Sequence, residues 1–332
     1  MMNWIFTSTP LHYFVQSLWR DEAFSYLLAK KSWLEILFLS AKDFSPPLYY
    51  LLLNIWLRLF GASEISLRSF SFVTFAAILY VTFLFLTNIF KIKEKWIYVY
   101  LLLFLFNPFL NYYAFEVRMY MLLAFFTLLS FYFLYNFRPL KYLLVTLLGL
   151  LTHYFMFFVL LAQAVFVLTA RSYKASDKLF QLKTIVRPVV LFIPWLIFVF
   201  SQHKFDAEFW IQKPPLETFF QIPAVMFVGY ERNLGFYQQW LLPFSLFLLA
   251  IILYGVWKIT KKKYNIATKE KRDLLYLLLS WALLPAAVTF VVSAVYPLFL
   301  PRYLIFSGVG MVLLMVFLLE QIGRKMRWIF FG

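Results

Sequence analysis

A few carboxylates and arginines interrupt an otherwise very apolar chain of 332 residues, and they are the groups that could carry out chemistry. Asp21 and Glu22 follow Trp19 at the end of a first apolar run. An ionised carboxylate at that point could take a proton from an incoming hydroxyl or amine. The alternative is a solvated acidic pair that marks a helix end. Because carboxylates at the edge of a bilayer are costly to keep and usually functional, we expect residues 19–50 to hold the active site.

Asp43 lies in the same stretch, shortly before Ser45-Pro46-Pro47. A proline pair fixes the direction of the backbone, which suits a group that must be positioned for a reaction. The alternative is helix capping by Asp43 or Ser45, which needs no substrate. The two roles are compatible.

Further candidates come later in the chain. Glu116 and Arg118 lie close together before Tyr120 and could pair with each other, or Arg118 could bind a phosphate through its planar fork. Arg302-Tyr303 follows Pro301 and is either an interfacial anchor or a phosphate contact. His153 is more often a structural residue in such a turn. Four charged residues of the 202–236 loop are available for acceptor contacts, and nothing in their spacing selects among them: Asp206, Glu208, Glu231 and Arg232.

The composition predicts the class of protein. Hydrophobic residues make up 64% of the chain and charged residues only 14%, whereas soluble domains carry roughly 45–50% apolar and about 25% charged residues. Repeated apolar runs of spanning length predict an all-α, polytopic transmembrane bundle. The net charge of +16 does not indicate nucleic-acid binding, because the basic residues lie in short loops between apolar runs. The absence of cysteine excludes disulfides and thiolate chemistry.

About ten spans are predicted. Residues 3–19 are barely long enough to cross about 30 Å of hydrocarbon, and the fifteen residues 46–60 are too short, so we expect them to form a surface or half-embedded helix that ends at Gly61. The remaining spans are 65–90, 96–113, 119–137, 140–151, 154–170, 184–201, 237–257, 274–296 and 303–320.

The distribution of charge predicts the orientation. Of the 31 Lys and Arg residues, 20 lie in alternate loops and in the C-terminal tail. The positive-inside rule then puts both termini in the cytoplasm of a cell whose plasma membrane holds the protein. Every candidate residue named above shares the extracytoplasmic face. The chain is predicted to be a single domain, 1–332, with extracytoplasmic loops at 20–64 and 202–236.

Five segments together resemble bacterial membrane glycosyltransferases of the GT-C class. They are Asp21-Glu22-Ala23, DFSPPLYYLLL at 43–53, SEISLR at 63–68, YYAFEVRMY at 112–120 and PRY at 301–303. The chain is most similar to glycosyltransferase family 39, which includes protein O-mannosyltransferases and aminoarabinose transferases. The similarity covers most of the chain and is strongest over residues 19–137.

The resemblance implies a polyprenyl-phosphate-linked sugar donor, an extracytoplasmic lipid, glycan or protein acceptor, and inversion at the anomeric carbon. It implies that Asp21 is the general base, that Glu22 supports it or the acceptor, and that Glu116 is the acidic residue of the second outer loop. Arg302 matches a phosphate contact. The other expected substrate contacts are Asp43, Tyr49, Arg118, Tyr120, His153 and Tyr303. Some relatives carry a lysine or histidine immediately before Pro-Pro, where this chain has Ser45, so Arg118 or Arg302 would have to contribute more to holding the phosphate.

Three questions stay open at this stage. The carboxylates could hold Mg²⁺ or Mn²⁺ through oxygen ligands, but they suffice for catalysis without an obligatory metal. A transporter or flippase of lipid-linked sugars could use the same groups as a binding site. Transporters tend to have repeated halves and ionisable residues near the bilayer midplane, whereas here these residues gather at one face, which favours the enzyme. A structural subunit would tolerate replacement of Asp21 and Arg302.

Overall fold

The computed structural model describes residues 11–202, 211–228, 241–261 and 268–322. These residues form helices joined by turns and loops and include no strand, which confirms the predicted all-α fold. The start of the predicted first span lies outside the described residues. So do the tail beyond 322 and two parts of the 202–236 loop, 203–210 and 229–236, which include Asp206, Glu208, Glu231 and Arg232.

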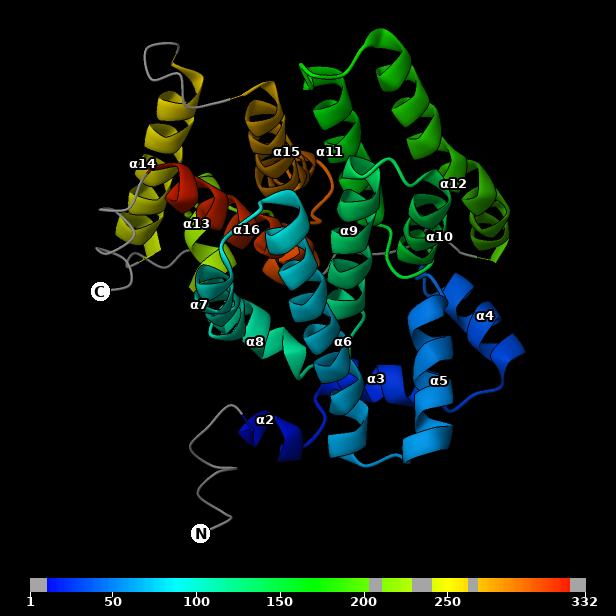
Figure 1. Ribbon diagram of the computed structural model, residues 1–332. Coiled ribbons are helices and arrows are strands. Elements are labelled where there is room, and N and C mark those ends of the chain that lie inside the picture. The colour runs from blue at the N-terminus through cyan, green and yellow to red at the C-terminus, as the bar shows by residue number, and fades with distance from the viewer. Residues whose placement is uncertain (1–10, 203–210, 229–240, 262–267, 323–332) are drawn as a thin grey trace.

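Four helices lie together at the lower end of the molecule (Figure 1). They are α2 (His12–Val15), α3 (Arg20–Ala29), α4 (Trp33–Lys42) and α5 (Leu48–Phe60). Helix α5 ends as predicted, because Gly61 adopts a φ of 81°, which is favourable only for a residue without a Cβ. The backbone N–H of Leu48 donates to the carbonyl of Leu151 at 3.0 Å, so the start of α5 is held by the end of α10.

The other helices form the bundle above them (Figure 1). They are α6 (Glu64–Leu84) with the π-helical turn η1 (Phe85–Ile89), α7 (Glu94–Leu105), α8 (Pro108–Ala114), α9 (Tyr120–Tyr135), α10 (Pro139–Leu150), α11 (Met156–Thr169), α12 (Ala175–Gln202), α13 (Glu217–Val228), α14 (Leu241–Thr260), α15 (Lys269–Val292), the 3₁₀ turn η3 (Pro301–Leu304) and α16 (Ile305–Ile322).

Five of the described helices are long and apolar enough to cross a membrane: α6 with η1, α12, α14, α15, and α16 with η3. Helices α7 and α8 pass the same test as a pair but are bent by 66° at their junction. Each of the nine runs predicted from residue 65 onwards contains a helix, several of them only 10–17 residues long. Helix α13, which falls inside the predicted 202–236 loop, was not predicted.

The continuous first span predicted over 3–19 is wrong in its described part. Helix α2 has only four residues, and Gln16 is extended with a ψ of 153°. The reason is a competing set of hydrogen bonds: Arg68 of α6 donates to the carbonyls of Phe14, Gln16 and Ser17. These carbonyls therefore accept hydrogen bonds from a guanidinium and not from the backbone N–H groups of a continuing helix.

Helix α16 lies at the centre of the bundle, and 89% of its spanning window is buried. Trp281 of α15 packs against it, donating its indole N–H to the carbonyl of Phe306 at 2.8 Å and stacking on Phe131 with ring centroids 4.3 Å apart. A Cβ on Gly310 would come within 2.8 Å of the Trp281 ring, so the close approach of α15 and α16 requires a glycine here.

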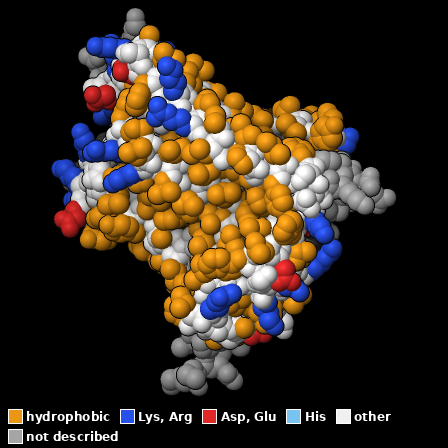
Figure 2. All heavy atoms as spheres, turned by 90° about the vertical axis from the view of Figure 1, so that its right-hand side faces the viewer, with side chains coloured by type: hydrophobic (Ala, Val, Ile, Leu, Met, Phe, Trp, Pro, Cys, Tyr) orange, Lys and Arg blue, Asp and Glu red, His pale blue; other side chains and the backbone are white. Residues whose placement is uncertain are grey.

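Hydrophobic side chains also cover the outside of the molecule, as a membrane environment requires. Figure 2 shows one face with a broad hydrophobic middle and with Lys and Arg gathered toward its edges. Exposed apolar residues such as Leu144, Val190 and Ile197 are 54–65% accessible. Such an extent of apolar surface is unusual for a soluble monomer and normal in lipid.

Candidate active site

Asp21 and Arg302 come together although they lie near opposite ends of the chain. Asp21 is in the first turn of α3, where the helix dipole favours a negative charge. Arg302 is placed by the short turn η3, which Pro301 begins. One guanidinium nitrogen of Arg302 lies 3.8 Å from Oδ2 of Asp21. Because this distance is too long for a hydrogen bond, the contact is electrostatic and leaves the carboxylate oxygens open to a substrate hydroxyl.

Burial distinguishes the two partners. The Arg302 side chain is 9% exposed and the Asp21 side chain 27% exposed. Arg302 also lies over the rings of Trp19 and Tyr303, each 5.7 Å from its centroid. An anchor at the membrane interface would reach outward, so Arg302 does not have the geometry of the simple interfacial anchor considered above.

Arg118 approaches Asp21 from another direction. The segment between α8 and α9 carries Arg118, whose guanidinium donates to the Asp21 carbonyl at 3.4 Å and to Oγ of Ser25 at 3.3 Å. It also lies over the Tyr120 ring at 5.7 Å. Its Nε is buried without an acceptor in the described part of the chain. Arg302 thus lies near the carboxylate of Asp21, and Arg118 binds the backbone carbonyl of the same residue.

Aromatic residues form one wall of this site. The rings of Tyr120, His153 and Tyr303 lie 5.4–6.2 Å from one another. The Tyr120 hydroxyl is buried, as are those of Tyr49 and Tyr50 at the start of α5. Their polar neighbours are Arg118 for Tyr50 and Tyr120, and Ser71 for Tyr49.

His153 lies in the turn between α10 and α11, and its Nδ1 accepts the backbone N–H of Phe155 at 3.1 Å. Burial, together with the positive charge of Arg118, lowers the pKa of His153 to about 3. The imidazole is therefore neutral at physiological pH. It can pack against a sugar or donate one hydrogen bond, but it cannot supply a positive charge to a phosphate.

Glu22 faces away from the open part of the site. Arg68 donates to both of its oxygens, at 3.0 and 2.6 Å, and the backbone N–H of Val117 and that of Trp19 donate at 3.1 and 3.3 Å. Glu22 is only 2% exposed and Arg68 only 1%. With its lone pairs already used, Glu22 holds the start of α3 against α6 and the 115–119 segment. In this geometry Glu22 therefore supports Asp21 structurally, by fixing the start of the helix that carries it.

Arg68 is the residue beside the site that the sequence reasoning missed, although it ends the SEISLR segment. An arginine inside an otherwise apolar spanning helix is the signal that would have found it, because such a charge needs a buried partner.

Glu116 is buried at 5% exposure. Its backbone carbonyl accepts the hydroxyl of Ser71 from α6 at 2.5 Å, which ties its segment to that helix. Its carboxylate is close enough to Tyr120 to influence that residue electrostatically. Glu116 therefore borders the aromatic wall, and its catalytic role stays a prediction.

Asp43 ends α4 as its C-terminal cap and is exposed. Its Oδ2 accepts the hydroxyl of Ser45 at 3.3 Å. Pro47 occupies the N-cap position of α5 and no side chain caps that helix, so neither Asp43 nor Ser45 caps its start. Asp43 does adjoin the site, because Asp43 and Arg118 are both close enough to Tyr50 to act on it electrostatically. Asp43 also lines a cleft between α3 and α4.

No group of three or more His, Cys, Asp or Glu side chains capable of holding a metal ion is found among the described residues. Metal dependence stays an open prediction.

No protein-family model and no curated protein matches the chain. A solved structure does resemble it: the crystal structure of ArnT from Cupriavidus metallidurans in the apo state, with a TM-score of 0.62 and 15% sequence identity. The match covers 98% of this chain but 61% of that chain, so this protein spans about three-fifths of the length of its structural relative. At this identity, the likeness shows a common polytopic, all-α membrane fold.

Proposed function

We propose that this protein is a membrane glycosyltransferase that moves a sugar from a polyprenyl-phosphate donor to an extracytoplasmic acceptor, with Asp21 as the general base. The observation that carries the proposal is the meeting of two arginines at Asp21: Arg302 lies 3.8 Å from its carboxylate, and the Arg118 guanidinium donates to its backbone carbonyl. The three residues come from α3, the 115–119 segment and η3. A chain does not bring such distant charges together in an apolar bundle without cost.

The arrangement supplies both groups that the reaction needs. The acceptor hydroxyl gives its proton to Asp21, and the acceptor oxygen forms a bond to the anomeric carbon. The bond between that carbon and the phosphate oxygen breaks, and its electron pair goes to the phosphate. Arg118 and Arg302 stabilise the negative charge that develops on the leaving polyprenyl phosphate. The acceptor oxygen attacks from the side opposite the leaving group, so the anomeric configuration inverts.

Two independent features support this class of function. The five sequence segments resemble the GT-C class, and the fold is similar to that of ArnT. Ser45 stands where some relatives of that class carry a lysine or histidine, and the two arginines provide the positive charge that Ser45 lacks. The buried tyrosine hydroxyls around Arg118 offer further hydrogen bonds to a phosphate or a sugar.

The test is turnover by purified protein in vesicles, with a panel of polyprenyl-phosphate sugars and a membrane extract as the source of acceptor. Mass spectrometry detects free polyprenyl phosphate and the new glycoconjugate. We expect both with the wild type, and a loss of about 10²- to 10⁴-fold with Asp21→Asn, the usual contribution of a general base. Glu64→Gln is the matched control, because Glu64 is an exposed carboxylate in the first turn of α6.

Other outcomes would redirect the assignment. Activity untouched by Asp21→Asn would move the base to Asp43 or Glu116. Movement of intact donor between leaflets, without release of polyprenyl phosphate, would contradict the enzyme and identify a flippase. Full activity in both Asp21→Asn and Arg302→Gln would show that this site is not the active site.

A further inference from the structure

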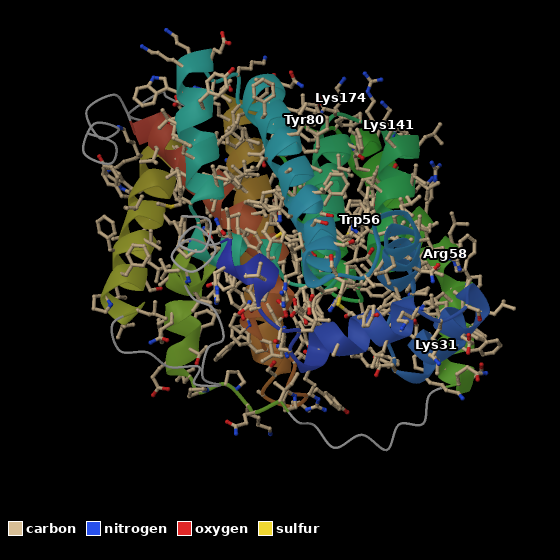
Figure 3. All side chains as sticks on the ribbon, turned by 90° about the horizontal axis from the view of Figure 1, so that it is seen from below. Lys31, Trp56, Arg58, Tyr80, Lys141 and Lys174 are labelled. Atoms are coloured by element: carbon tan, nitrogen blue, oxygen red, sulfur yellow. The ribbon has the colours of Figure 1, made fainter. Side chains whose placement is uncertain are left out.

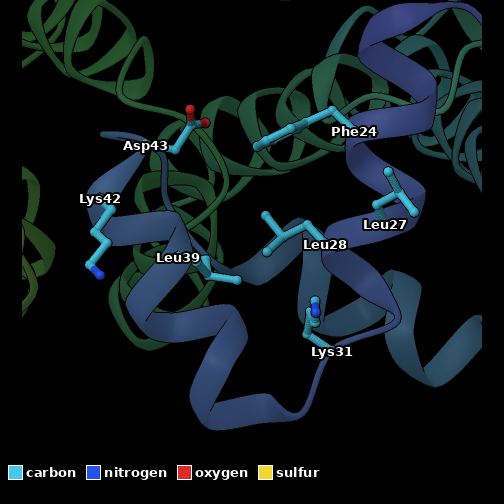
Figure 4. A pocket seen from close by; sticks show the side chains of 7 residues that line it. All are labelled: Phe24, Leu27, Leu28, Lys31, Leu39, Lys42 and Asp43. Atoms are coloured by element: carbon cyan, nitrogen blue, oxygen red, sulfur yellow. The ribbon is translucent and has the colours of Figure 1, made fainter.

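A cleft of about 420 Å³ separates α3 and α4, beside the site described above (Figure 4). Phe24, Leu27 and Leu28 of α3 form one wall, and Leu39 of α4 faces them. The volume falls within the range of about 300–1,000 Å³ that is usual for small-molecule sites. Apart from three charged side chains, the lining is hydrocarbon, so the cleft suits an apolar chain.

The charges are unevenly placed around this cleft. Lys31, which follows α3, lies at one end of the cleft, and Lys42 and its neighbour Asp43 lie together at the other end, where α4 finishes (Figure 4). Phe24 and Lys31 are seven residues apart, which corresponds to about 10 Å along a helix axis. An anionic group is therefore attracted to the Lys31 end, whereas at the other end the charges of Lys42 and Asp43 offset each other.

The two walls are held in place before any ligand binds. Asn54 of α5 donates to the carbonyls of Ala29 and Lys31, at 2.7 and 3.1 Å. Its Oδ1 accepts the indole N–H of Trp33 at 2.9 Å. Ser32 begins α4 with a reciprocal cap to Glu35. Because the turn between α3 and α4 is fixed at three points, the protein loses little conformational entropy when a ligand binds in the cleft.

Apolar surface also continues outward from the cleft. Trp33, Leu34 and Phe38 of α4 are 53%, 71% and 47% exposed, and Leu27 of α3 is 60% exposed. Seen from below, Lys31 lies at the margin of the molecule (Figure 3). A short helix with exposed Trp, Leu and Phe beside lysines has the character of a helix that lies in the membrane interface. The open side of the cleft therefore faces lipid.

We propose that the cleft between α3 and α4 binds one anionic phospholipid, with an acyl chain along Phe24, Leu28 and Leu39 and its phosphate at Lys31. The apolar walls select a hydrocarbon chain, and Lys31 selects a negative headgroup over a zwitterionic one. Asp43 fixes the direction, because its negative charge offsets that of Lys42 at the other end of the cleft. The lipid is a bound partner of α3, the helix that carries Asp21, and it is not consumed.

The experiment is photolabelling of the full chain in vesicles that contain phosphatidylglycerol with a diazirine in one acyl chain. Labelled peptides are mapped by mass spectrometry, so no transfer activity is needed. We expect label on residues 24–39 of the wild type. In Lys31→Gln, that label falls severalfold. Lys30→Gln is the matched control, because the Lys30 side chain is exposed and does not line the cleft.

A second variant tests the apolar part independently of charge. Leu39→Trp fills the cleft and should remove the label while Lys31 remains. Three results would overturn the proposal: equal labelling by a diazirine phosphatidylcholine, unchanged labelling of Lys31→Gln, or unchanged labelling of Leu39→Trp. Displacement of the label by an equimolar amount of polyprenyl phosphate would also overturn it, since the cleft would then belong to the sugar donor.

Discussion

Arg68 holds both carboxylate oxygens of Glu22 across 46 residues of sequence, with nitrogen–oxygen distances of 3.0 and 2.6 Å. The same guanidinium binds the carbonyls of residues 14, 16 and 17, and the same carboxylate accepts the backbone N–H of Val117. One buried ion pair therefore joins α6, the start of α3 and the segment that carries Arg118. Asp21 and Arg118 are each one residue away from a group that this pair fixes.

Removal of Arg68 should destabilise the fold. In Arg68→Met, Glu22 would be left as a buried charge without its partner, and breaking such a pair costs about 3–5 kcal/mol. We expect a marked fall in thermal stability in detergent, measured by size-exclusion chromatography after heating.

Arg58→Met on α5 is the control for this substitution, since Arg58 is an exposed arginine at the same end of the molecule. Equal stability of Arg68→Met and Arg58→Met would show that the pair does not hold the fold. Glu22→Met/Arg68→Met should recover part of the loss, because two apolar side chains leave no buried charge.

Lysine substitutions test whether the two arginines of the site contribute more than a positive charge. Arg118→Lys and Arg302→Lys keep a cation but lose the planar fork that matches a phosphate. We expect roughly tenfold to hundredfold lower kcat/KM for the polyprenyl-phosphate donor in each variant, measured by release of polyprenyl phosphate. The KM for the acceptor should change much less.

Arg20→Lys provides the comparison, because Arg20 is exposed beside Asp21 and makes no ion pair in the described structure. If Arg118→Lys and Arg302→Lys both match Arg20→Lys in kcat/KM, neither arginine binds the leaving phosphate, and the phosphate contact must lie elsewhere.

The fold class could be read from composition, because a chain with 64% hydrophobic residues in repeated long runs has few alternatives to a helical bundle. The helix at 46–60 was predicted because two prolines and one glycine mark its ends. The first span failed for a reason that local pattern cannot reveal. Its carbonyls bind Arg68, and a contact between residues about 50 apart leaves no trace in hydrophobic periodicity.

Only part of the site could be predicted, because its long-range contacts also leave no trace in the local sequence pattern. Asp21, Arg118 and Arg302 stood out as charges at the ends of apolar runs, and the structure brings them together. Sequence could not distinguish Asp21 from its neighbour Glu22. On a helix, consecutive residues point about 100° apart, so one carboxylate faces the site while the next is enclosed by Arg68. Only the contact of Glu22 with Arg68 of α6 distinguishes the two carboxylates.

Chelation tests the open question of a metal. No cluster of three metal-ligating side chains occurs among the described residues, and Arg118 with Arg302 can supply positive charge to a phosphate. We expect transfer activity in vesicles to persist after EDTA treatment, within about twofold of the untreated enzyme. A loss that Mn²⁺ or Mg²⁺ restores would show that a metal ion takes part and that its ligands include substrate oxygens or residues outside the described ranges.

His153 should make the stability of the protein depend on pH without making its catalysis do so. Its pKa is lowered to about 3 by burial and by Arg118, whereas an unfolded histidine has a pKa of about 6.5. The unfolded chain therefore binds a proton below pH 6.5 that the folded chain refuses, and stability is lost as the pH falls from about 6.5 toward 3. By pH 5 this amounts to about 2 kcal/mol.

Thermal unfolding in detergent at pH 7.5 and pH 5 measures this effect. His153→Gln should show a smaller difference between the two pH values than the wild type, since glutamine does not titrate. His12→Gln, at an exposed position, should keep the wild-type difference. The acid limb of the transfer rate should be the same in His153→Gln and wild type, because a neutral imidazole gives up no proton between pH 5 and 8. A shifted limb would instead make His153 a group that titrates during the reaction.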